Sequence, residues 1–600
     1  MKHIMTVGLL FCLFLSTDFV YSVPDESSSQ VFIRVNQLGF LPRNHKTAIL
    51  FSQQPLNAEV KLIDRQKGQT VFAAKPEEFK QKGWGNFNYY YRFDFSSIIA
   101  AGEYFIAAGN DTSFHFSIND SLYSGIPDIL LEYMRQQRCG YNSFWDEVCH
   151  QHDGRTFFAP LPDSSFIDVS GGWHDAGDDL KYLLTASYAT AVMLISYRLN
   201  PGIFSDRVDC LGQPYPNDIP DLLDEARWGL DWIHKLHPNS TNLYHQVADD
   251  RDHIGWKFPY RDSSDYGWGP ESYRPVYYAN GKPQGLGPFQ SQSDGIANLA
   301  GRCAASMAMA YTIWKESLND TVFADRCRRS ALELYNIGKN NEGVQQGNSY
   351  GAPYRYGEIT WADDMEWAAA ELFRITQNES YLRDAIRYAT MIQDLSWMGR
   401  DTASHYEYYP FLNVGHYSLH QIIHSSDRDI LASYYREGIE KCIEKGKANP
   451  FQIGVPFIWC SNNLVTALVS QCALYEKMSG NDQFKNFMTL QRDWLFGLNP
   501  WGTSMFVGIP ANGDYPEHPH ASTYALTGRQ ITGGLVDGPV YGSIFKSLKG
   551  LYLSKVDEFA EFQTDYVVYH DDIADYSSNE PTMDGTAAAI LMFTLLNMQK

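Results

Sequence analysis

The period of the hydrophobic pattern changes near residue 120, and this change constrains the fold more than any other feature of the chain. From residue 31 to 120, short runs such as EVKLID, YYYRFDF and GEYFIAA alternate apolar and polar residues between Gly, Pro, Asn and Asp. Such runs are typical of strands joined by turns. About seven of them in roughly ninety residues predict a small β-sandwich over residues 31–120.

Beyond about residue 122, apolar residues recur at helical spacing. In NDIPDLLDEARWGLDWIHKL, Leu223, Ala226 and Leu230 fall on one face, and Pro220 falls near the first turn, where a missing N–H does no harm. About ten to twelve such segments predict an all-α domain over residues 121–600. The intervening segments 249–287 and 499–528 are rich in Gly, Pro and aromatic residues, and loops of this length are usually functional.

The N-terminus has the pattern of a secretory signal peptide. Lys2 and His3 precede an apolar run from Ile4 to Leu15 that is too short to span a bilayer. We expect cleavage after Ser22, a linker over residues 23–30, and export to the periplasm or the cell exterior. Cys12 lies inside the apolar run, so it does not predict a lipid anchor, and no other stretch is apolar for long enough to cross a membrane.

Net charge and aromatic content indicate which classes of molecule the protein can bind. The 600 residues carry a formal net charge of −22, which argues against nucleic acids and anionic membrane surfaces. Aromatic residues make up 14% of the chain. A large core explains such a surplus, and so does a groove that binds the flat faces of sugars.

Two acidic clusters lie about four hundred residues apart. GGWHDAGDDLKYL (171–183) holds Asp175, Asp178 and Asp179, and YHDDIADYSSNEPTMDGTA (569–587) holds Asp571 and Glu580 among other acids. Two carboxylates with different protonation states are what glycoside hydrolysis needs, because one donates a proton while the other activates water. A calcium site, or aspartates that cap helices, would explain the same clusters.

The segment RCGYNSFWDEVCHQH combines cysteines and histidines. Cys139, Cys149 and the adjacent His150 suggest a tetrahedral zinc site, with His152 as an alternative ligand. A disulfide between the two cysteines is the competing interpretation, because export permits one.

Several of these motifs resemble one family. GGWHDAGDDLKYL and YHDDIADYSSNE resemble the catalytic motifs of family 9 glycoside hydrolases, the cellulase family with an (α/α)6 barrel. DIPDLLDEARWGLDWI, WAAAELFRIT, FIWCSNN and WLFGLNPWGTSMFVG are similar to further family segments in the expected order, and IRVNQLGFLP resembles the start of the Ig-like domain that often precedes the barrel. The resemblance covers residues 31–598. It implies a multidomain protein with an Ig-like β-sandwich followed by an all-α (α/α)6 barrel.

The resemblance also implies roles for the acids. Asp178 would be the general base, and Asp175, expected on the same turn, would hold the same attacking water. Glu580 would be the general acid, in a dry setting that raises its pKa. We expect Asp571 to support the site, and Asp179 to support or cap it. The family inverts the anomeric configuration, which implies carboxylates on the order of 6.5–9.5 Å apart.

Sugar-binding residues follow from the same resemblance and from the loops. His518 matches the histidine of a His-x-Arg motif that binds the sugar next to the cleaved bond, but His520 stands where the arginine is usual. Tyr576 lies in the C-terminal motif, and Trp256 and Trp501 lie in the long loops, so we expect all three to contact substrate.

Metal sites are implied as well. By match to a zinc-carrying branch of the family, the zinc ligands would be Cys139, Cys149, His150 and His174. In GEITWADDMEW, Glu358, Asp363 and Asp364 fall where helices of this family often meet calcium. Acids placed at a helix N-terminus by the helix dipole explain that segment equally well. No organic cofactor is expected.

The sequence thus predicts an exported, monomeric, inverting endo-β-1,4-glucanase acting on cellulose-like glucan, mixed-linkage glucan or xyloglucan. An exo-acting β-glucosidase or glucosaminidase is the first alternative, because the 249–287 segment could close one end of the cleft. A non-catalytic glycan-binding protein is the second. The family pattern is altered in WCSN, where Gly is usual at Cys460, and at Pro581 and Thr586 beside Glu580.

Overall fold

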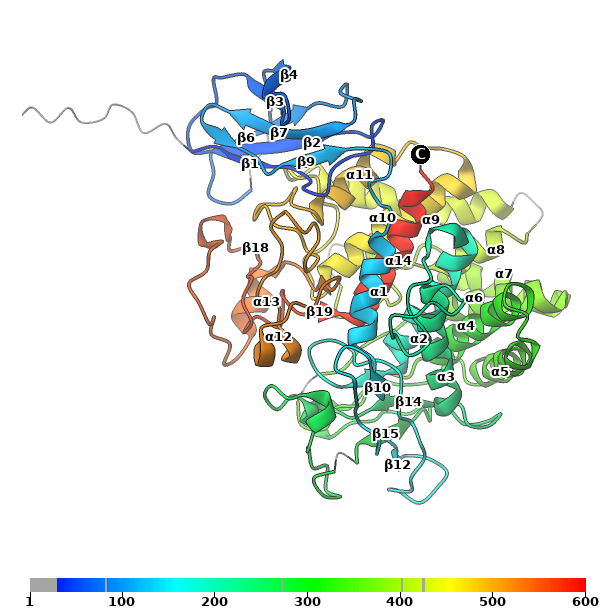
Figure 1. The fold of residues 1–600 in the computed structure, drawn as a ribbon. Coiled ribbons are helices and arrows are strands. Elements are labelled where there is room, and N and C mark those ends of the chain that lie inside the picture. The colour runs from blue at the N-terminus through cyan, green and yellow to red at the C-terminus, as the bar shows by residue number, and fades with distance from the viewer. Residues whose placement is uncertain are drawn as a thin grey trace, which may run out of the picture.

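The computed structural model describes residues 30–80, 84–271, 273–352, 354–400, 403–423 and 427–599. The predicted signal peptide 1–22 and residues 23–29 of the predicted linker lie outside the described residues. Two domains follow each other along the chain, a β-sandwich and a helical barrel (Figure 1).

The N-terminal domain consists of two antiparallel sheets packed face to face. One sheet has the order β1-β2-β6-β5 and the other β4-β3-β7-β8, with β9 also pairing with β7. Inward-facing side chains such as Leu50, Leu62 and Ile106 form its core. The described strands are β1 (Phe32–Arg34), β2 (Thr47–Ser52), β3 (Val60–Asp64), β4 (Gln69–Ala74), β5 (Glu77–Glu78), β6 (Tyr89–Asp94), β7 (Gly102–Ala108), β8 (Asp111–Thr112) and β9 (Phe116–Ile118).

The second domain is a double ring of helices. Its inner helices contact one another in the order α14, α2, α4, α6, α8 and α10, and α10 returns to α14. They are α2 (Leu183–Leu199), α4 (Ala297–Glu316), α6 (Ala362–Thr376), α8 (Val414–His420), α10 (Ser461–Ser479) and α14 (Met583–Asn597). The outer helices are α1 (Ile126–Gln136), α3 (Asp221–Leu236), α5 (Thr321–Asn340), α7 (Glu379–Ile392), α9 (Asp427–Gly446) and α11 (Lys485–Trp494). Two short helices, α12 (Ser522–Thr527) and α13 (Gly542–Ser547), lie in loops. The predicted fold class, an Ig-like sandwich followed by an (α/α)6 barrel, is confirmed.

Burial explains why each helix takes its place. In α14, residues 583–596 are all buried, as expected of a helix that is apolar on every side and enclosed by others. In α3, by contrast, Leu223, Ala226 and Leu230 are buried on the predicted face, while other positions remain partly exposed. None of the helices in the described residues combines the length and apolar character needed to cross a bilayer.

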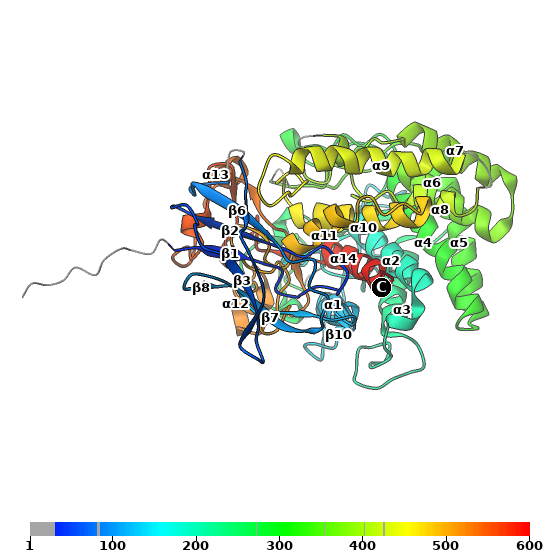
Figure 2. The same cartoon turned by 90° about the horizontal axis from the view of Figure 1, so that it is seen from above.

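The sandwich packs against the barrel beside α11 (Figures 1 and 2). Asn36 Nδ2 donates to Asp493 Oδ1 on α11 at 2.7 Å, and Gln37 Nε2 donates to the Gly502 carbonyl at 2.6 Å. Phe51 and Trp84 belong to the same apolar cluster as the barrel core. The two domains therefore share a continuous buried interface.

Loops and short strands gather at the N-terminal ends of α2 and α14. A small sheet of order β12-β15-β14-β13 is built from β12 (Arg155–Phe157), β13 (Lys181–Tyr182), β14 (Tyr244–Val247) and β15 (Pro275–Tyr278). The long segment after Val247 is the connection between β14 and β15. Because β13 pairs with β14, this connection lies beside the acidic segment that precedes β13. Further two-stranded pairs are β10 (Tyr141–Asn142) with β11 (Glu147–Val148), β16 (Leu535–Val536) with β19 (Pro581–Thr582), and β17 (Val540–Tyr541) with β18 (Val567–Val568).

Candidate active site

The two main catalytic candidates line one cavity. Asp178 precedes β13 and α2, while Glu580 precedes β19 and α14, and these two inner helices are neighbours. Both residues line a cavity of about 410 Å³, a size typical of ligand sites. The structure therefore brings together the two acidic segments whose carboxylates the sequence analysis assigned to one reaction.

Asp178 lies in a bend, not on a helical turn. Residues 176–178 form the bend, which is closed by a hydrogen bond from Asp175 N to the Leu180 carbonyl at 2.9 Å. Leu180 N donates to Asp178 Oδ1 at 2.8 Å, and His253 Nε2 lies 3.3 Å from Asp178 Oδ2. The expectation that Asp175 and Asp178 share a helical face is wrong, because the segment is not helical.

Asp175 is buried beneath this bend. Its carboxylate accepts hydrogen bonds from Thr185 on α2 and from the Tyr356 hydroxyl, and it is not part of the cavity lining. Burial, followed by the nearby charges of Asp584 and Asp178, raises the pKa of Asp175 well above its usual range. Asp175 thus anchors the bend to the barrel, and its shared hold on an attacking water stays a prediction.

Glu580 touches the opposite side of the same bend. Gly177 N donates to Glu580 Oε1 at 2.9 Å. A Cβ atom at Gly177 would lie 2.7 Å from that oxygen and 2.5 Å from the His520 carbonyl, so this contact requires glycine. Burial, followed by the charges of Asp178 and Asp537, raises the pKa of Glu580 well above its usual range. A general acid at neutral pH needs a shift in this direction.

Asp537 is a buried carboxylate of the site that the sequence analysis missed. It follows β16, which pairs with β19 next to Glu580. Trp459 Nε1 donates to Asp537 Oδ2 at 2.8 Å, and Cys460 Sγ donates to Oδ1 at 3.2 Å. Asp537 thereby orients Trp459, whose ring lines the cavity. Asp537 lies outside both acidic clusters, so its own sequence position gave no signal. The altered WCSN segment, whose Trp459 and Cys460 contact Asp537, was the one indirect indication.

Asp571 supports a loop and does not line the cavity. It accepts hydrogen bonds from the backbone N–H of His518 at 2.9 Å and from Asn579 Nδ2 at 3.0 Å, in agreement with the expected support role. His518 Nδ1 lies 3.1 Å from Asp571 Oδ2 and 2.9 Å from Lys555 Nζ. The structure places His520, and not His518, in the wall of the cavity.

The aromatic candidates divide into two groups. Trp256 and Tyr576 line the cavity, and so do Tyr354 and Trp459, which were not singled out from the sequence. Trp501 is only 2% exposed and packs its ring against other buried aromatic rings. The prediction that Trp501 contacts substrate is wrong, because its loop folds into the core at this point.

The connection between β14 and β15 forms one wall of the cavity. It contributes Asp252, His253, Trp256 and Lys257, and the Trp256 ring centroid lies 4.6 Å from that of His520 on the facing loop. His253 is also the residue that contacts Asp178. The sequence marked this connection by its length and composition, but the role of His253 had no separate signal.

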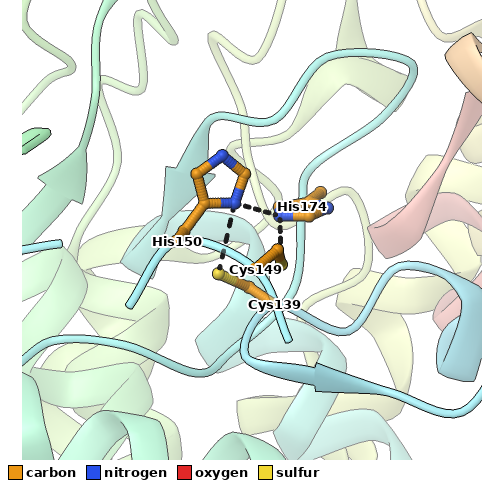
Figure 3. A group of neighbouring side chains, drawn as sticks. All are labelled: Cys139, Cys149, His150 and His174. Carbon is orange, nitrogen blue, oxygen red and sulfur yellow. Dashed lines mark hydrogen bonds between the residues drawn. The ribbon is translucent and has the colours of Figure 1, made fainter. Parts of the chain in front are cut away.

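A second cluster lies behind the bend (Figure 3). Cys139, Cys149, His150 and His174 are all buried, and each offers one ligand atom within 4.8 Å of the others. His174 Nε2 lies 3.2 Å from His150 Nδ1 and 3.8 Å from Cys149 Sγ, and Cys139 Sγ lies 3.9 Å from His150 Nδ1. Tetrahedral zinc with bonds of about 2.0–2.3 Å places ligand atoms about 3.3–3.8 Å apart, so this donor set fits zinc.

The alternatives to this ligand set are not seen. Cys139 and Cys149 are both free, so the alternative disulfide is absent. His152 is exposed, stacks on Tyr273 and lies outside the cluster. The outer nitrogens of the two clustered histidines face carboxylates, since His150 Nε2 lies 3.1 Å from Asp262 and His174 Nδ1 lies 3.6 Å from Asp179.

Two of the three proposed calcium ligands already bind a cation. Arg302 Nε and Nη2 bind Asp364 at 2.8 and 2.7 Å, and Nη2 binds Glu358 at 2.5 Å. All three side chains are fully buried, Asp363 is buried beside them, and the four form what we call the Arg302 cluster. Arg302 thus already binds Glu358 and Asp364, and calcium binding at this segment stays a prediction.

Comparisons with known proteins agree with this architecture. The family model described as glycosyl hydrolase family 9 matches residues 123–593, and the model of the cellulase N-terminal Ig-like domain matches residues 28–113. A xyloglucan-specific endo-β-1,4-glucanase of Bacteroides ovatus is 24% identical over 626 positions, covering 99% of this chain and 98% of the relative. Endoglucanase D of Acetivibrio thermocellus is 24% identical over 507 positions, covering 81% of this chain and 74% of the relative.

Solved structures share the fold. A metagenome-derived family 9 endoglucanase matches with a TM-score of 0.74 at 22% identity, covering 94% of this chain and 99% of that one. A Zn-binding triple mutant of the family 9 endoglucanase J30 matches with a TM-score of 0.73 at 23% identity, covering 92% and 99%. Since the family model spans nearly the whole barrel and endoglucanases align along the chain, the protein belongs to glycoside hydrolase family 9 and is an enzyme of that family.

Proposed function

We propose that the enzyme is an exported, inverting endo-β-1,4-glucanase. The observation that carries this proposal is the pair of carboxylates in one cavity, where Asp178 lies against His253 and Glu580 has a raised pKa. One carboxylate can act as base and the other as acid, which is the division of labour that glycoside hydrolysis requires. The predicted signal peptide supports export. The non-catalytic alternative is set aside because the chain belongs to an enzyme family and keeps both groups in the cavity.

The reaction then follows from the placement of these two groups. Asp178 takes a proton from a water that attacks the anomeric carbon, and Glu580 gives its proton to the glycosidic oxygen as the carbon–oxygen bond breaks. Attack on the face opposite the leaving group inverts the configuration. The contact of His253 Nε2 with Asp178 Oδ2 at 3.3 Å would hold this carboxylate in place beside the attacking water.

The substrate would be a soluble β-glucan. Trp256, Tyr354, Trp459 and Tyr576 offer ring faces and polar edges in the cavity wall, as sugar recognition requires. The specificity of the Bacteroides ovatus relative supports testing xyloglucan first, beside mixed-linkage glucan and soluble cellulose derivatives.

A zinc ion would fit the buried cluster as a structural metal. Cys139, Cys149, His150 and His174 would fill all four tetrahedral positions, so such a site has no open position for substrate. The ion would cross-link the loop after α1 to the segment that carries Asp178. The Zn-binding J30 variant, which has the same fold, supports testing for zinc.

Exo action remains a second candidate, favoured by one observation. The contact between Trp256 and His520 joins the two loops across the cavity. If this contact closes one end of the cavity, only the end of a glucan chain can enter, and the enzyme would be exo-acting.

One experiment tests both candidates. The purified enzyme is incubated with xyloglucan, mixed-linkage glucan and a short aryl β-glycoside, products are sized, and NMR identifies the first anomer formed. We expect a rapid fall in polymer length and initial α-anomers. Release of a single short product with slow loss of length would favour exo action, and initial β-anomers would overturn the inverting mechanism.

A further inference from the structure

We propose that Lys257 couples the metal cluster to the substrate cavity, so that metal binding places the wall formed by residues 249–262. This inference rests on the zinc site proposed above and assigns Lys257 as a positioning residue. Its ammonium group reaches the metal cluster on one side through carboxylates, and its side chain lines the cavity on the other.

The first link joins the metal ligands to two carboxylates. His150 uses Nδ1 toward the cysteines and Nε2 toward Asp262, while His174 uses Nε2 toward the cluster and Nδ1 toward Asp179. The contact of His150 with Asp262 is a hydrogen bond of 3.1 Å, and that of His174 with Asp179 is an ion pair of 3.6 Å. Contacts of metal-bound histidines with carboxylates fix the ring orientation and the position of the carboxylate together. Asp262 belongs to the connection between β14 and β15, and Asp179 belongs to the bend that carries Asp178.

The second link joins those carboxylates through Lys257. Its Nζ lies 3.1 Å from Asp262 Oδ2, 2.8 Å from Asp252 Oδ1 and 3.9 Å from Asp179 Oδ2. Asp252 in turn accepts a hydrogen bond from the backbone N–H of Asp179 at 2.9 Å. One cation therefore holds three carboxylates, two of which also contact the ligand histidines.

Charge explains why Lys257 fills this position better than a second metal ion. His150, Asp179 and Asp262 also come within metal-binding distance of one another, but the Lys257 ammonium already lies among these carboxylates. A zinc ion with two thiolates and two neutral imidazoles adds no net charge to the buried network. Metal binding can therefore order the histidines without displacing Lys257.

The third link reaches the substrate. His253 and Trp256 lie between Asp252 and Lys257 along the chain. His253 contacts Asp178, and Trp256 contacts His520. The anchors at Asp252, Lys257 and Asp262 are buried or nearly so, whereas Ile254 between them is 72% exposed. A short exposed segment held at both ends by one ionic network should lose its place when the network loosens.

The test uses the full-length enzyme in three forms. They are wild type, Lys257→Met and Lys257→Arg, each measured with Zn²⁺ bound and after chelation with restoration by added Zn²⁺. The readouts are metal content, amide hydrogen exchange of residues 249–262, and separate kcat and KM values on xyloglucan. Lys235→Met is the matched control, because Lys235 also binds a neighbouring loop, at Ser170 and Asp168, without contacting the metal cluster.

We expect chelation of wild type to speed exchange in residues 249–262 and to raise KM by about tenfold, and Zn²⁺ to reverse both. Lys257→Met should show the same exchange and KM with metal still bound, and Lys257→Arg should restore both in part. If chelation unfolds the whole protein, the test rests on hydrogen exchange of residues 249–262 in the metal-loaded Lys257→Met enzyme. Unchanged exchange in that variant, or a matching change in Lys235→Met, overturns the coupling. An active, zinc-loaded enzyme that gives this result would leave the proposed function intact.

Discussion

Two groups of carboxylates in this protein differ in the partners that their side chains have. In the Arg302 cluster, a fully buried guanidinium binds Glu358 and Asp364 through three short contacts. At the cavity, the charge of Asp178 contributes to the raised pKa of Glu580. Among the described residues, only the backbone N–H of Gly177 donates a hydrogen bond to Glu580. A carboxylate held by a buried guanidinium is fixed within the fold, whereas a carboxyl group in a cavity without such a partner stays available for proton transfer.

Removal of the acid should give the largest effect. Glu580→Gln keeps the shape of the side chain but cannot release a proton, so we expect kcat on β-glucan to fall about 10²–10⁴-fold with unchanged thermal unfolding. Glu561→Gln, at an exposed position, is the matched control. Rates close to wild type in Glu580→Gln would remove this residue from the acid role.

Removal of the cation from the other cluster should instead destabilise the fold. Arg302→Met leaves Glu358 and Asp364 buried without a cation, and we expect the free energy of unfolding to fall by about 3–5 kcal/mol. Urea unfolding measures this, with the exposed Arg436→Met as a control expected within about 0.5 kcal/mol of wild type. Equal stabilities of the two variants would mean that the clusters do not differ as described.

A substitution that changes no charge can test the contact between the two sides of the cavity. The Cβ atom of Gly177→Ala would lie too close to Glu580 Oε1 and to the His520 carbonyl, so both must shift. Small misplacements of catalytic groups cost up to about 10²-fold in rate, and we expect a loss of about 10–100-fold in kcat. Gly202→Ala, where a Cβ atom meets open space, should be unaffected. Equal rates in the two variants would show that the contact does not position Glu580.

The pH profile should report the raised pKa. Glu580 donates a proton only while protonated, so kcat/KM should fall as pH rises through the pKa of Glu580, at a pH well above the ordinary glutamate value of about 4.3. The small residual activity of Glu580→Gln should lack this alkaline fall. A wild-type profile that already falls below pH 5 would contradict the burial of Glu580.

The smallest effect should come from a ring in the cavity wall. Trp256→Ala removes one stacking face, and we expect KM to rise by up to about tenfold with stability unchanged. Trp501→Ala, in the core, should cost about 3–5 kcal/mol of stability instead. Kinetics and unfolding of both variants separate the two roles, and a stability loss in Trp256→Ala would contradict its placement in the wall.

The sequence predicted those features that a local pattern can encode. The change of hydrophobic period marked both domains, and the clustered acids and the cysteine–histidine spacing marked two acidic segments and a candidate metal site. The family resemblance then singled out Asp178, Glu580 and the ligand His174. Such signals exist because the chemistry needs particular side chains close together along the chain. Arg302 could not be found in this way, since it reaches its acids from α4, some sixty residues away.

Orientation was harder to predict than proximity. Asp537 stands alone in the sequence and becomes part of the site only because β16 pairs with β19. Trp256 and Trp501 look alike as aromatic residues in long loops, and only the packing of those loops sends one to the cavity and the other to the core. The bend at residues 176–178, taken for a helical turn, shows the same limit at the scale of a few residues.

The ring of inner helices closes where α14 meets α2, so the first and last quarters of the barrel sequence contribute one carboxylate each. A ribosome making this enzyme has therefore built almost the entire catalytic domain before Glu580 emerges. With the proposed roles, hydrolytic activity would arise only after the final helix docks, because a chain interrupted before that point would lack both the proposed acid and α14, the helix that closes the ring.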